Sequence, residues 1–156
     1  MISCIFENKS QTSLRHVVVH AIVEKEDSLL LVKRAPGLLE GGKWSLPSGF
    51  MDRDEDGPQA VLRELHEETG WRGEVTSLFR VNTSPNRPHE DRQNVALEYL
   101  VKPFKLDGIP DLESTKVEWI PIDKLLSFSE FAFDHGESIR LYLSYRKEKF
   151  TLPLVI

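Results

Sequence analysis

The sequence predicts an α+β protein, an α/β/α sandwich in which a mixed β-sheet is flanked by helices. Two observations support this fold class. The run Val17–Val23 is apolar almost throughout, as expected of a strand buried on both faces. The patterns along the chain follow the order strands, helix, strands, helix, which is typical of layered α and β elements. A length of 156 residues is that of one domain, and no linker interrupts it, so we expect a single domain over residues 1–156.

The chain begins with an alternating pattern and then a hairpin. Ile2, Cys4 and Phe6 lie at alternate positions, as in a short strand, and the segment Asn8–Ser13 that follows is polar. Val17–Val23 follows, and the polar turn Glu24–Asp27 connects it to a second strand, Ser28–Arg34. The next segment, Ala35–Lys43, contains several Gly and Pro residues and is predicted to be a loop.

The central helix is predicted over Pro58–Thr69. Gly57 and Pro58 mark its start, because proline suits the first helical position, and Gly70 provides a left-handed stop. At about 100° per residue the side chains divide into three faces. The core face contains Pro58, Val61, Leu62, Leu65 and Thr69. The carboxylate face contains Glu64, Glu67 and Glu68, and the solvent face contains Gln59, Arg63 and His66.

The carboxylate face predicts a metal site. Glu64, Glu67 and Glu68 are three and four residues apart, so their like charges repel and a positive charge should offset them. Clustered carboxylate oxygens suit Mg²⁺ or Mn²⁺, and the carbonyl of the preceding glycine turn, at Gly49, can add another oxygen. Neither His nor Cys joins the cluster, which argues against zinc. A solvated acidic helix is the alternative interpretation of the carboxylates alone.

Beyond the helix the chain is predicted to return as strands over Glu74–Val81, Asn94–Val101 and Lys116–Pro121. Between the first two lies Asn82–Gln93, a long polar loop. A loop of this length in a compact domain tends to be functional, and a mobile surface loop is the alternative. Lys102–Glu113 contains two prolines and a glycine and is interpreted as a connecting segment.

The C-terminal part is predicted to contain a helix start at Pro121–Leu125 and a packing helix from His135 to about Arg146. The apolar tail Phe150–Ile156 either adds an edge strand or meets a partner subunit, which leaves a homodimer open. His16 and His20 are interpreted as hydrogen-bonded structural histidines, because no potential ligand residues cluster with them.

Composition limits the function classes. The 20 Lys plus Arg against 25 Asp plus Glu give a net charge of −5, so nothing indicates general binding to nucleic acid or to an anionic membrane. Cys4 is the single cysteine, which excludes an intramolecular disulfide. No apolar run is long enough to span a membrane, and the N-terminus lacks the pattern of a signal peptide. We therefore expect a cytoplasmic protein.

The stretch Gly49–Trp71 resembles the signature of the Nudix hydrolases. Gly49, five residues, Glu55, seven residues and then Arg63-Glu64-Leu65-His66-Glu67-Glu68-Thr69-Gly70-Trp71 fill every specified position of G-x5-E-x7-R-E-U-x-E-E-x-G-U, where U is a bulky apolar residue. The preceding Trp44–Gly49 is similar to the family's W-x-L-P-G-G, with Ser48 in place of the first glycine. The resemblance implies a mixed sheet between helices and hydrolysis of a nucleoside diphosphate linked to another moiety.

The same resemblance implies roles for individual residues. Glu67 and Glu68 are the implied principal ligands of Mg²⁺, for which Mn²⁺ can substitute, with Glu64 and the Gly49 carbonyl as further ligands. Arg63 is implied to pair with Glu55 and so to orient the site, and direct metal ligation by Glu55 is the alternative. We predict Arg63, Glu64 and Glu113 as catalytic residues. Glu113 is the first candidate for the general base, and the competing candidates are Glu98, Glu90 and Asp91.

The substrate is less directly encoded. Arg34, Arg87 and Arg92 are candidate substrate-binding residues, because each is placed to reach phosphate from a strand end or the long loop. The segment Phe131–Gly136 resembles a C-terminal stretch of ADP-ribose pyrophosphatase-like members, which favours ADP-ribose or a nucleoside diphosphate sugar. One alternative is a hydrolase that removes oxidised or non-standard nucleoside triphosphates from the nucleotide pool. Another is a Nudix-type regulatory module that binds nucleotides without catalysis.

Overall fold

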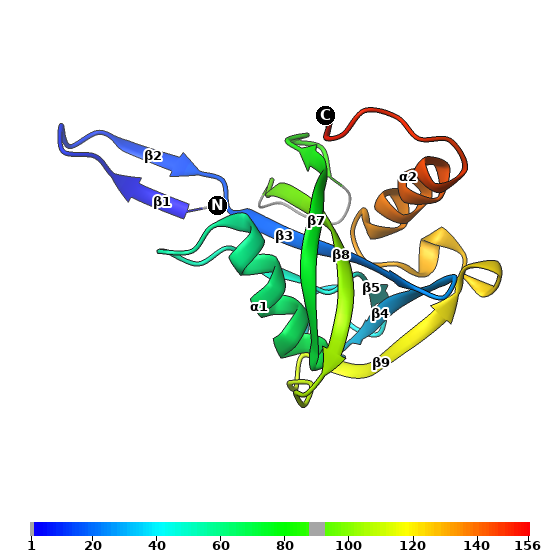
Figure 1. Cartoon of the computed structure of the whole chain (residues 1–156). Coiled ribbons are helices and arrows are strands. Elements are labelled where there is room, and N and C mark those ends of the chain that lie inside the picture. The colour runs from blue at the N-terminus through cyan, green and yellow to red at the C-terminus, as the bar shows by residue number, and fades with distance from the viewer. Residues whose placement is uncertain (1, 88–92) are drawn as a thin grey trace.

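The computed structural model describes residues 2–87 and 93–156. A mixed sheet separates two α-helices, α1 and α2, which lie on opposite sides of it (Figure 1). The sheet has the order β10-β7-β8-β3-β4-β5, with β6 paired to β3 and β9 paired to β4. The elements are β3 (Val17–Lys25), β4 (Ser28–Arg34), β5 (Trp44–Ser45), β6 (Ser48–Phe50), α1 (Gly57–Thr69), β7 (Trp71–Asn82), β8 (Val95–Leu106), β9 (Ser114–Pro121), α2 (His135–Lys147) and β10 (Leu154–Val155). The predicted α/β/α sandwich is confirmed.

Strand β3 organises the sheet because it has partners along both edges. It pairs in parallel with β8 over Val17–Val23, and on its other edge it pairs antiparallel with β6 and then with β4. The β6 pairing places Gly49 opposite Val19. The turn that leads into α1 is therefore fixed to the centre of the sheet.

The alternation of side chains along β3 supplies the core on both faces. Val19, Ala21 and Val23 face α1, where they pack with Val61 and Leu65. On the other face Ile22 belongs to a second apolar cluster, whose remaining buried members are Leu29, Leu31, Leu46, Phe79, Phe131 and Ile139. This explains why the predicted strand is apolar almost throughout: both of its faces contribute to an apolar cluster.

Helix α1 begins one residue before the predicted start and ends at the predicted residue. Asp56 caps its N-terminus by accepting a hydrogen bond from the Gln59 amide, and the Gln59 side chain accepts one from the Asp56 amide. Gly70 has a φ of 73°, the left-handed conformation expected of a C-terminal glycine.

Strand β8 is longer than predicted. Lys102–Leu106, interpreted from the sequence as part of a connecting segment, continues β8 and pairs with the start of β7. The register shifts between Arg72 and Gly73, and Pro103 lies opposite Gly73 at that irregularity. A proline is tolerated at such a position because it need not donate to the ladder.

Three other segments refine the sequence-based expectations. The helix predicted to start at Pro121 is only a 3₁₀ turn, Ile122–Lys124, because Leu125 returns to an extended conformation. The N-terminal alternation is part of a hairpin of β1 (Ile2–Ile5) and β2 (Gln11–Leu14), which projects away from the sheet (Figure 1). The tail does add an edge strand, since β10 pairs in parallel with β7. No helix in the described ranges is long and apolar enough to cross a membrane.

Candidate active site

One pocket of about 510 Å³ lies against α1 and β6, and charged residues of both signs line it. Its acidic lining residues are Asp52, Glu64, Glu67, Asp111 and Glu113. Its basic lining residues are Arg34, Arg63 and Arg87. Most of the residues predicted for the site thus lie around a single cavity, although they come from segments far apart in the sequence.

Arg63 connects the carboxylates on the acidic side of this pocket. Its guanidinium donates to both carboxylate oxygens of Glu55, at 3.1 and 2.7 Å, and to the Phe50 carbonyl at 2.9 Å. Its Nη1 also donates to Glu64 at 2.8 Å and to Glu67 at 3.0 Å. The expectation that Arg63 lies on the solvent face of the helix is therefore wrong, because the long side chain bends toward the carboxylates. It is the positive charge that the acidic cluster requires.

Glu55 is held as an ionised group. The hydrogen bond from Arg63 lowers the pKa of the Glu55 carboxyl, and a hydrogen bond from the Asp52 amide adds to this effect. The hydrogen bond to Glu55 raises the pKa of the Arg63 guanidinium, and the contacts with Glu64 and Glu67 add to this effect. Glu55 thus fixes the direction of Arg63 from the loop that precedes α1, which agrees with the orienting role implied by the resemblance.

Glu64 and Glu68 are crowded carboxylates. Burial raises the pKa of Glu64, and the charges of Glu67 and Glu113 raise it further, against the effect of Arg63. Burial also raises the pKa of Glu68 well above its usual value. Glu68 is only 3% exposed, and its Oε2 accepts a hydrogen bond of 2.8 Å from the Ser48 amide. Serine in place of the first glycine preserves this contact, because the donor is the backbone.

The donor set fits a hard divalent cation. In the part of the chain that the structure describes, no three acidic, histidine or cysteine side chains are grouped closely enough to hold a metal ion, since Arg63 binds Glu64 and Glu67 while Ser48 binds Glu68. These donors are nevertheless all oxygens, as a hard divalent cation prefers, and burial together with neighbouring carboxylate charge raises the pKa of Glu64 and of Glu68. At Gly49 a Cβ would overlap the Glu64 carboxylate, so this side chain lies directly over the glycine backbone.

Glu113 reaches the pocket through the loop that follows β8. The Asp111 amide donates to the Glu67 carbonyl at the end of α1, at 2.9 Å, and the Asp111 side chain accepts from the Glu113 amide at 2.9 Å. The Ala35 amide donates to the Glu113 carbonyl at 2.8 Å. Asp111 lines the pocket and was missed by the sequence analysis, although its position two residues before Glu113 was an available signal.

Of the competing candidates for the general base, the structure describes only Glu98. Glu98 is fully buried and does not line the pocket. Its Oε1 accepts hydrogen bonds from Arg80 at 2.9 Å and from Ser138 at 2.8 Å. Glu90, Asp91 and the substrate-binding candidate Arg92 lie outside the described residues.

Arg34 and Arg87 both line the pocket, as predicted for substrate-binding residues, and both have protein contacts. The Arg34 Nε donates to the Leu39 carbonyl at 3.0 Å. Arg87 donates to Asp134 at 2.6 Å and to the Asn94 carbonyl at 3.2 Å. These contacts orient both guanidinium groups at the edge of the cavity.

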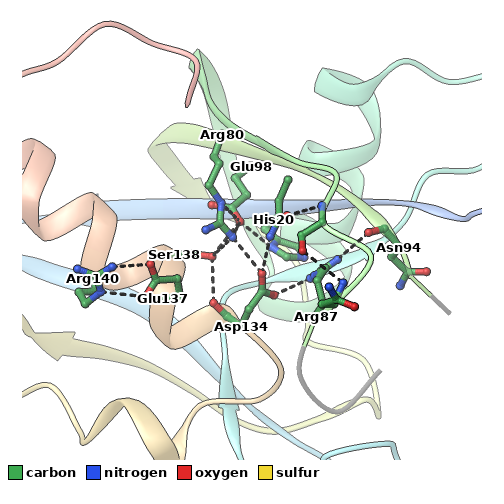
Figure 2. A network of polar contacts seen from close by, with 12 residues as sticks. His20, Arg80, Arg87, Asn94, Glu98, Asp134, Glu137, Ser138 and Arg140 are labelled. Carbon is green, nitrogen blue, oxygen red and sulfur yellow. Dashed lines mark hydrogen bonds and ion pairs between the residues drawn. The ribbon is translucent and has the colours of Figure 1, made fainter. Parts of the chain in front are cut away.

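A buried polar network lies beside the pocket, centred on Asp134 (Figure 2). Asp134 accepts hydrogen bonds from Arg80, Asn82 and Arg87, at 3.0, 2.8 and 2.6 Å. Burial acts to raise the pKa of the Asp134 carboxyl, but the hydrogen bond and charge of Arg87 outweigh it and hold the pKa well below its usual range. This network is not among the features predicted from the sequence. Its one signal was a pair of opposite charges in neighbouring strands, since Arg80 lies opposite Glu98.

His20 and His135 add two imidazole rings to the lining. Their rings lie 4.4 Å apart, and the His135 Nδ1 accepts a hydrogen bond of 3.0 Å from the Leu46 amide. Burial lowers the pKa of His135 well below its usual value. His20 is buried, which is consistent with a structural role. The predicted hydrogen bond is not found at its Nδ1, which lies 3.6 Å from Glu98, and among the described residues the buried Nδ1 of His16 likewise has no hydrogen-bond partner.

Residues 14–142 match the model of the NUDIX domain. The chain is 29% identical over 130 residues to a protein named ADP-ribose pyrophosphatase from Methanocaldococcus jannaschii, a match that covers 83% of this chain and 74% of that protein. A NUDIX hydrolase structure from Nitrosomonas europaea has a TM-score of 0.79 at 27% identity and covers 99% of this chain and 91% of its own. The NUDIX domain of Shewanella oneidensis NrtR, crystallised with ADP ribose, has a TM-score of 0.66 at 25% identity, with 86% and 90% coverage.

Proposed function

The chain belongs to the NUDIX domain family and is a hydrolase of pyrophosphate bonds, and we propose that it cleaves the diphosphate of a nucleoside diphosphate linked to another moiety in a Mg²⁺-dependent reaction. ADP-ribose or a nucleoside diphosphate sugar is the favoured substrate. The observation that carries this proposal is the acidic side of the pocket, where Arg63 binds Glu55, Glu64 and Glu67 beside the Gly49 turn. The relatives named for ADP-ribose support the choice of substrate.

Glu64, Glu67, Glu68 and the Gly49 carbonyl would hold the Mg²⁺. A divalent cation bound there lowers the pKa of water and neutralises the charge of the diphosphate. Burial raises the pKa of Glu64 and of Glu68 and so disfavours their ionised forms, and a cation bound to both carboxylates would offset that cost.

The chain's own residues provide positioning and proton transfer. Arg63, fixed by Glu55, keeps Glu64 and Glu67 directed toward the cavity. Glu113 lines the same cavity and is our candidate for the general base that takes a proton from the attacking water. Arg34 and Arg87 would bind the rest of the substrate, and a cavity of about 510 Å³ lies within the usual size of small-molecule sites.

A phosphate-release assay tests this proposal. The pure protein is incubated with Mg²⁺ and a coupled phosphatase, across nucleoside diphosphate sugars, dinucleoside polyphosphates and modified nucleoside triphosphates. We expect a clear preference for ADP-ribose, with ribose 5-phosphate as a product. Preference for a triphosphate with release of pyrophosphate would instead indicate a nucleotide-pool hydrolase. Nucleotide binding without any turnover would indicate a regulatory module, against which the complete acidic set argues.

A further inference from the structure

Phe133 has a backbone conformation that aromatic residues rarely adopt. Its φ is +50°, in the left-handed region, and its side chain lines the pocket. A residue with a Cβ is strained there, and such strain persists only where the surrounding structure holds the backbone in place. Strain of this kind clusters at ligand-binding sites, so the contacts on both sides of Phe133 indicate what the conformation serves.

The chain before Phe133 is fixed to the strand region that leads into the pocket. The Ala132 amide donates to the Trp44 carbonyl at 2.8 Å, and Phe131 forms a parallel bridge with Trp44. Ala132 and Phe131 are both buried, with Phe131 in the apolar cluster that α2 covers. The backbone therefore enters residue 133 in a defined position.

The chain after Phe133 is fixed more strongly still. Asp134 accepts hydrogen bonds from Arg80 and Arg87 (Figure 2). It also accepts one from Asn82, at the end of β7. The next residue, His135, accepts a hydrogen bond from the Leu46 amide. Buried charge-assisted contacts of this number are costly to break, so they hold Phe133 in its strained conformation.

The result is a row of flat groups along one part of the pocket. The Arg34 guanidinium carbon lies 5.3 Å from the centroid of the Phe133 ring. The Phe133 ring is 5.9 Å from the His135 ring, which is 4.4 Å from the His20 ring. All four residues line the cavity, and none comes from α1 or from the loop that carries Asp111 and Glu113. This part is suited to a planar group rather than to a metal-bound phosphate.

We infer that the Phe133–Arg34 pair binds the nucleobase of the substrate by stacking. This inference rests on the proposed function and deepens it, since it assigns the base and the diphosphate to different parts of one pocket. A ring face and a planar guanidinium stack with any base, and each such contact contributes substantially to nucleotide affinity. Arg34 is suited to this role because its Nε is already bound to the Leu39 carbonyl, which fixes the plane of the group.

The test compares two ligands that share a phosphate and differ in the base. Titration calorimetry of the whole chain with Mg²⁺ measures the affinity for ribose 5-phosphate and for AMP, GMP, CMP and UMP. We expect at least one nucleotide to bind about 10-fold more tightly than ribose 5-phosphate. Phe133→Gly should reduce that affinity to the level of ribose 5-phosphate, which itself should bind unchanged, and Phe133→Tyr should keep the preference. Glycine accepts a φ of +50°, so this variant should retain the backbone.

Two further variants make the comparison specific. Phe104→Gly removes an aromatic ring that is 64% exposed on β8 and does not line the pocket, so it should leave all affinities unchanged. Arg34→Lys keeps the charge but not the flat surface, and it should weaken nucleotide binding more than ribose 5-phosphate binding. If Arg34 bound the phosphate instead, Arg34→Lys would lower the affinities for the nucleotides and for ribose 5-phosphate equally.

Three results would overturn the inference: equal affinity of the wild-type protein for the nucleotides and ribose 5-phosphate, an equal loss of both in Phe133→Gly, or an unchanged preference in that variant. The measurement requires no turnover. Base binding through Phe133 in a protein that hydrolyses nothing would keep the inference and reject the proposed function. Hydrolysis of ADP-ribose by the wild-type protein, with an unchanged base preference in Phe133→Gly, would keep the proposed function and reject the inference.

Discussion

At the scale of single residues, the site is a balance of charge around Arg63. One guanidinium binds three glutamates and a backbone carbonyl, so it both neutralises the cluster and fixes its directions. Glu67 is the most exposed member, with a side-chain exposure of 49%, and it is the partner that a cation can draw away from Arg63 at the least cost.

Glu67→Gln tests this balance directly. The substitution removes an anionic oxygen with almost no change in volume, so hydrolysis should fall by roughly 100-fold or more at saturating Mg²⁺. The fold should persist, and thermal unfolding in EDTA should occur at the same temperature or slightly higher, because repulsion from Glu64 is relieved. Glu74→Gln, which changes an exposed glutamate on β7, is the matched control and should behave as the wild type. Full activity of Glu67→Gln with Mg²⁺ would contradict the assignment of this residue as a metal ligand.

At the scale of elements, the pairing of β6 with β3 brings the turn at Gly49 against α1. The helix then carries its carboxylates over the glycine, and the loop after β8 attaches to the end of the helix through Asp111. The site is thus built on one strand, one helix and one loop. Its geometry depends on a close approach that only glycine permits.

Gly49→Ala should disrupt this approach. The new methyl group would overlap the Glu64 carboxylate, so Glu64 or β6 must move and activity should fall on the order of 100-fold. Gly37→Ala is the matched control, because nothing lies within 4 Å of a Cβ at that position. Steady-state kinetics and Mg²⁺ titration of both variants provide the measurement. Equal activity of the two variants would show that the Glu64 position seen here is not required.

At the scale of the whole molecule, two buried features link stability to solution conditions. The α2 side of the sheet contains the Asp134 network and the neutral His135, and the α1 side contains the crowded carboxylates. Protonation of His135 is expected to change the stability of the α2 side, and a bound divalent cation is expected to change that of the α1 side.

Acid should destabilise the protein through His135. Its pKa is lowered in the folded state, so below about pH 6.5 the unfolded chain binds the proton more readily and the free energy of unfolding falls with decreasing pH. The contribution of this group to the change of unfolding free energy with pH is at most about 1.4 kcal/mol per pH unit, and it disappears well above about pH 6.5. Denaturant titrations between pH 8 and pH 5 should show a smaller slope for His135→Asn, whose amide oxygen can still accept from Leu46. An unchanged slope would show that His135 is not the titrating group.

Mg²⁺ should stabilise the fold. An ion that binds only the folded carboxylates adds about 2.7 kcal/mol at 100 times its Kd, because binding to one state shifts the folding equilibrium. The temperature of unfolding should therefore rise with Mg²⁺ and return to its original value with EDTA. The rise should be much smaller in Glu67→Gln, and a full rise in that variant would place the ion at another site.

The sequence by itself determined the features that depend on neighbouring residues. Strands over Val17–Val23 and Ser28–Arg34, the helix from Pro58 to Thr69 and its glycine stop follow from periodicity, turn residues and caps, which act within a few positions. The spacing of Glu64, Glu67 and Glu68 placed three carboxylates near one another for the same reason.

Only the tertiary structure decided what depends on distant residues. The bond of Arg63 to the Phe50 carbonyl, the contact of Asp111 with the end of α1 and the pairing of Arg80 with Glu98 each join residues far apart in the sequence. The strained conformation of Phe133 is held by contacts on both sides of it. The extension of β8 past Pro103 likewise required β7 as its partner. Local sequence patterns do not predict such contacts, because packing of the sheet against α1 and α2 determines which distant side chains meet.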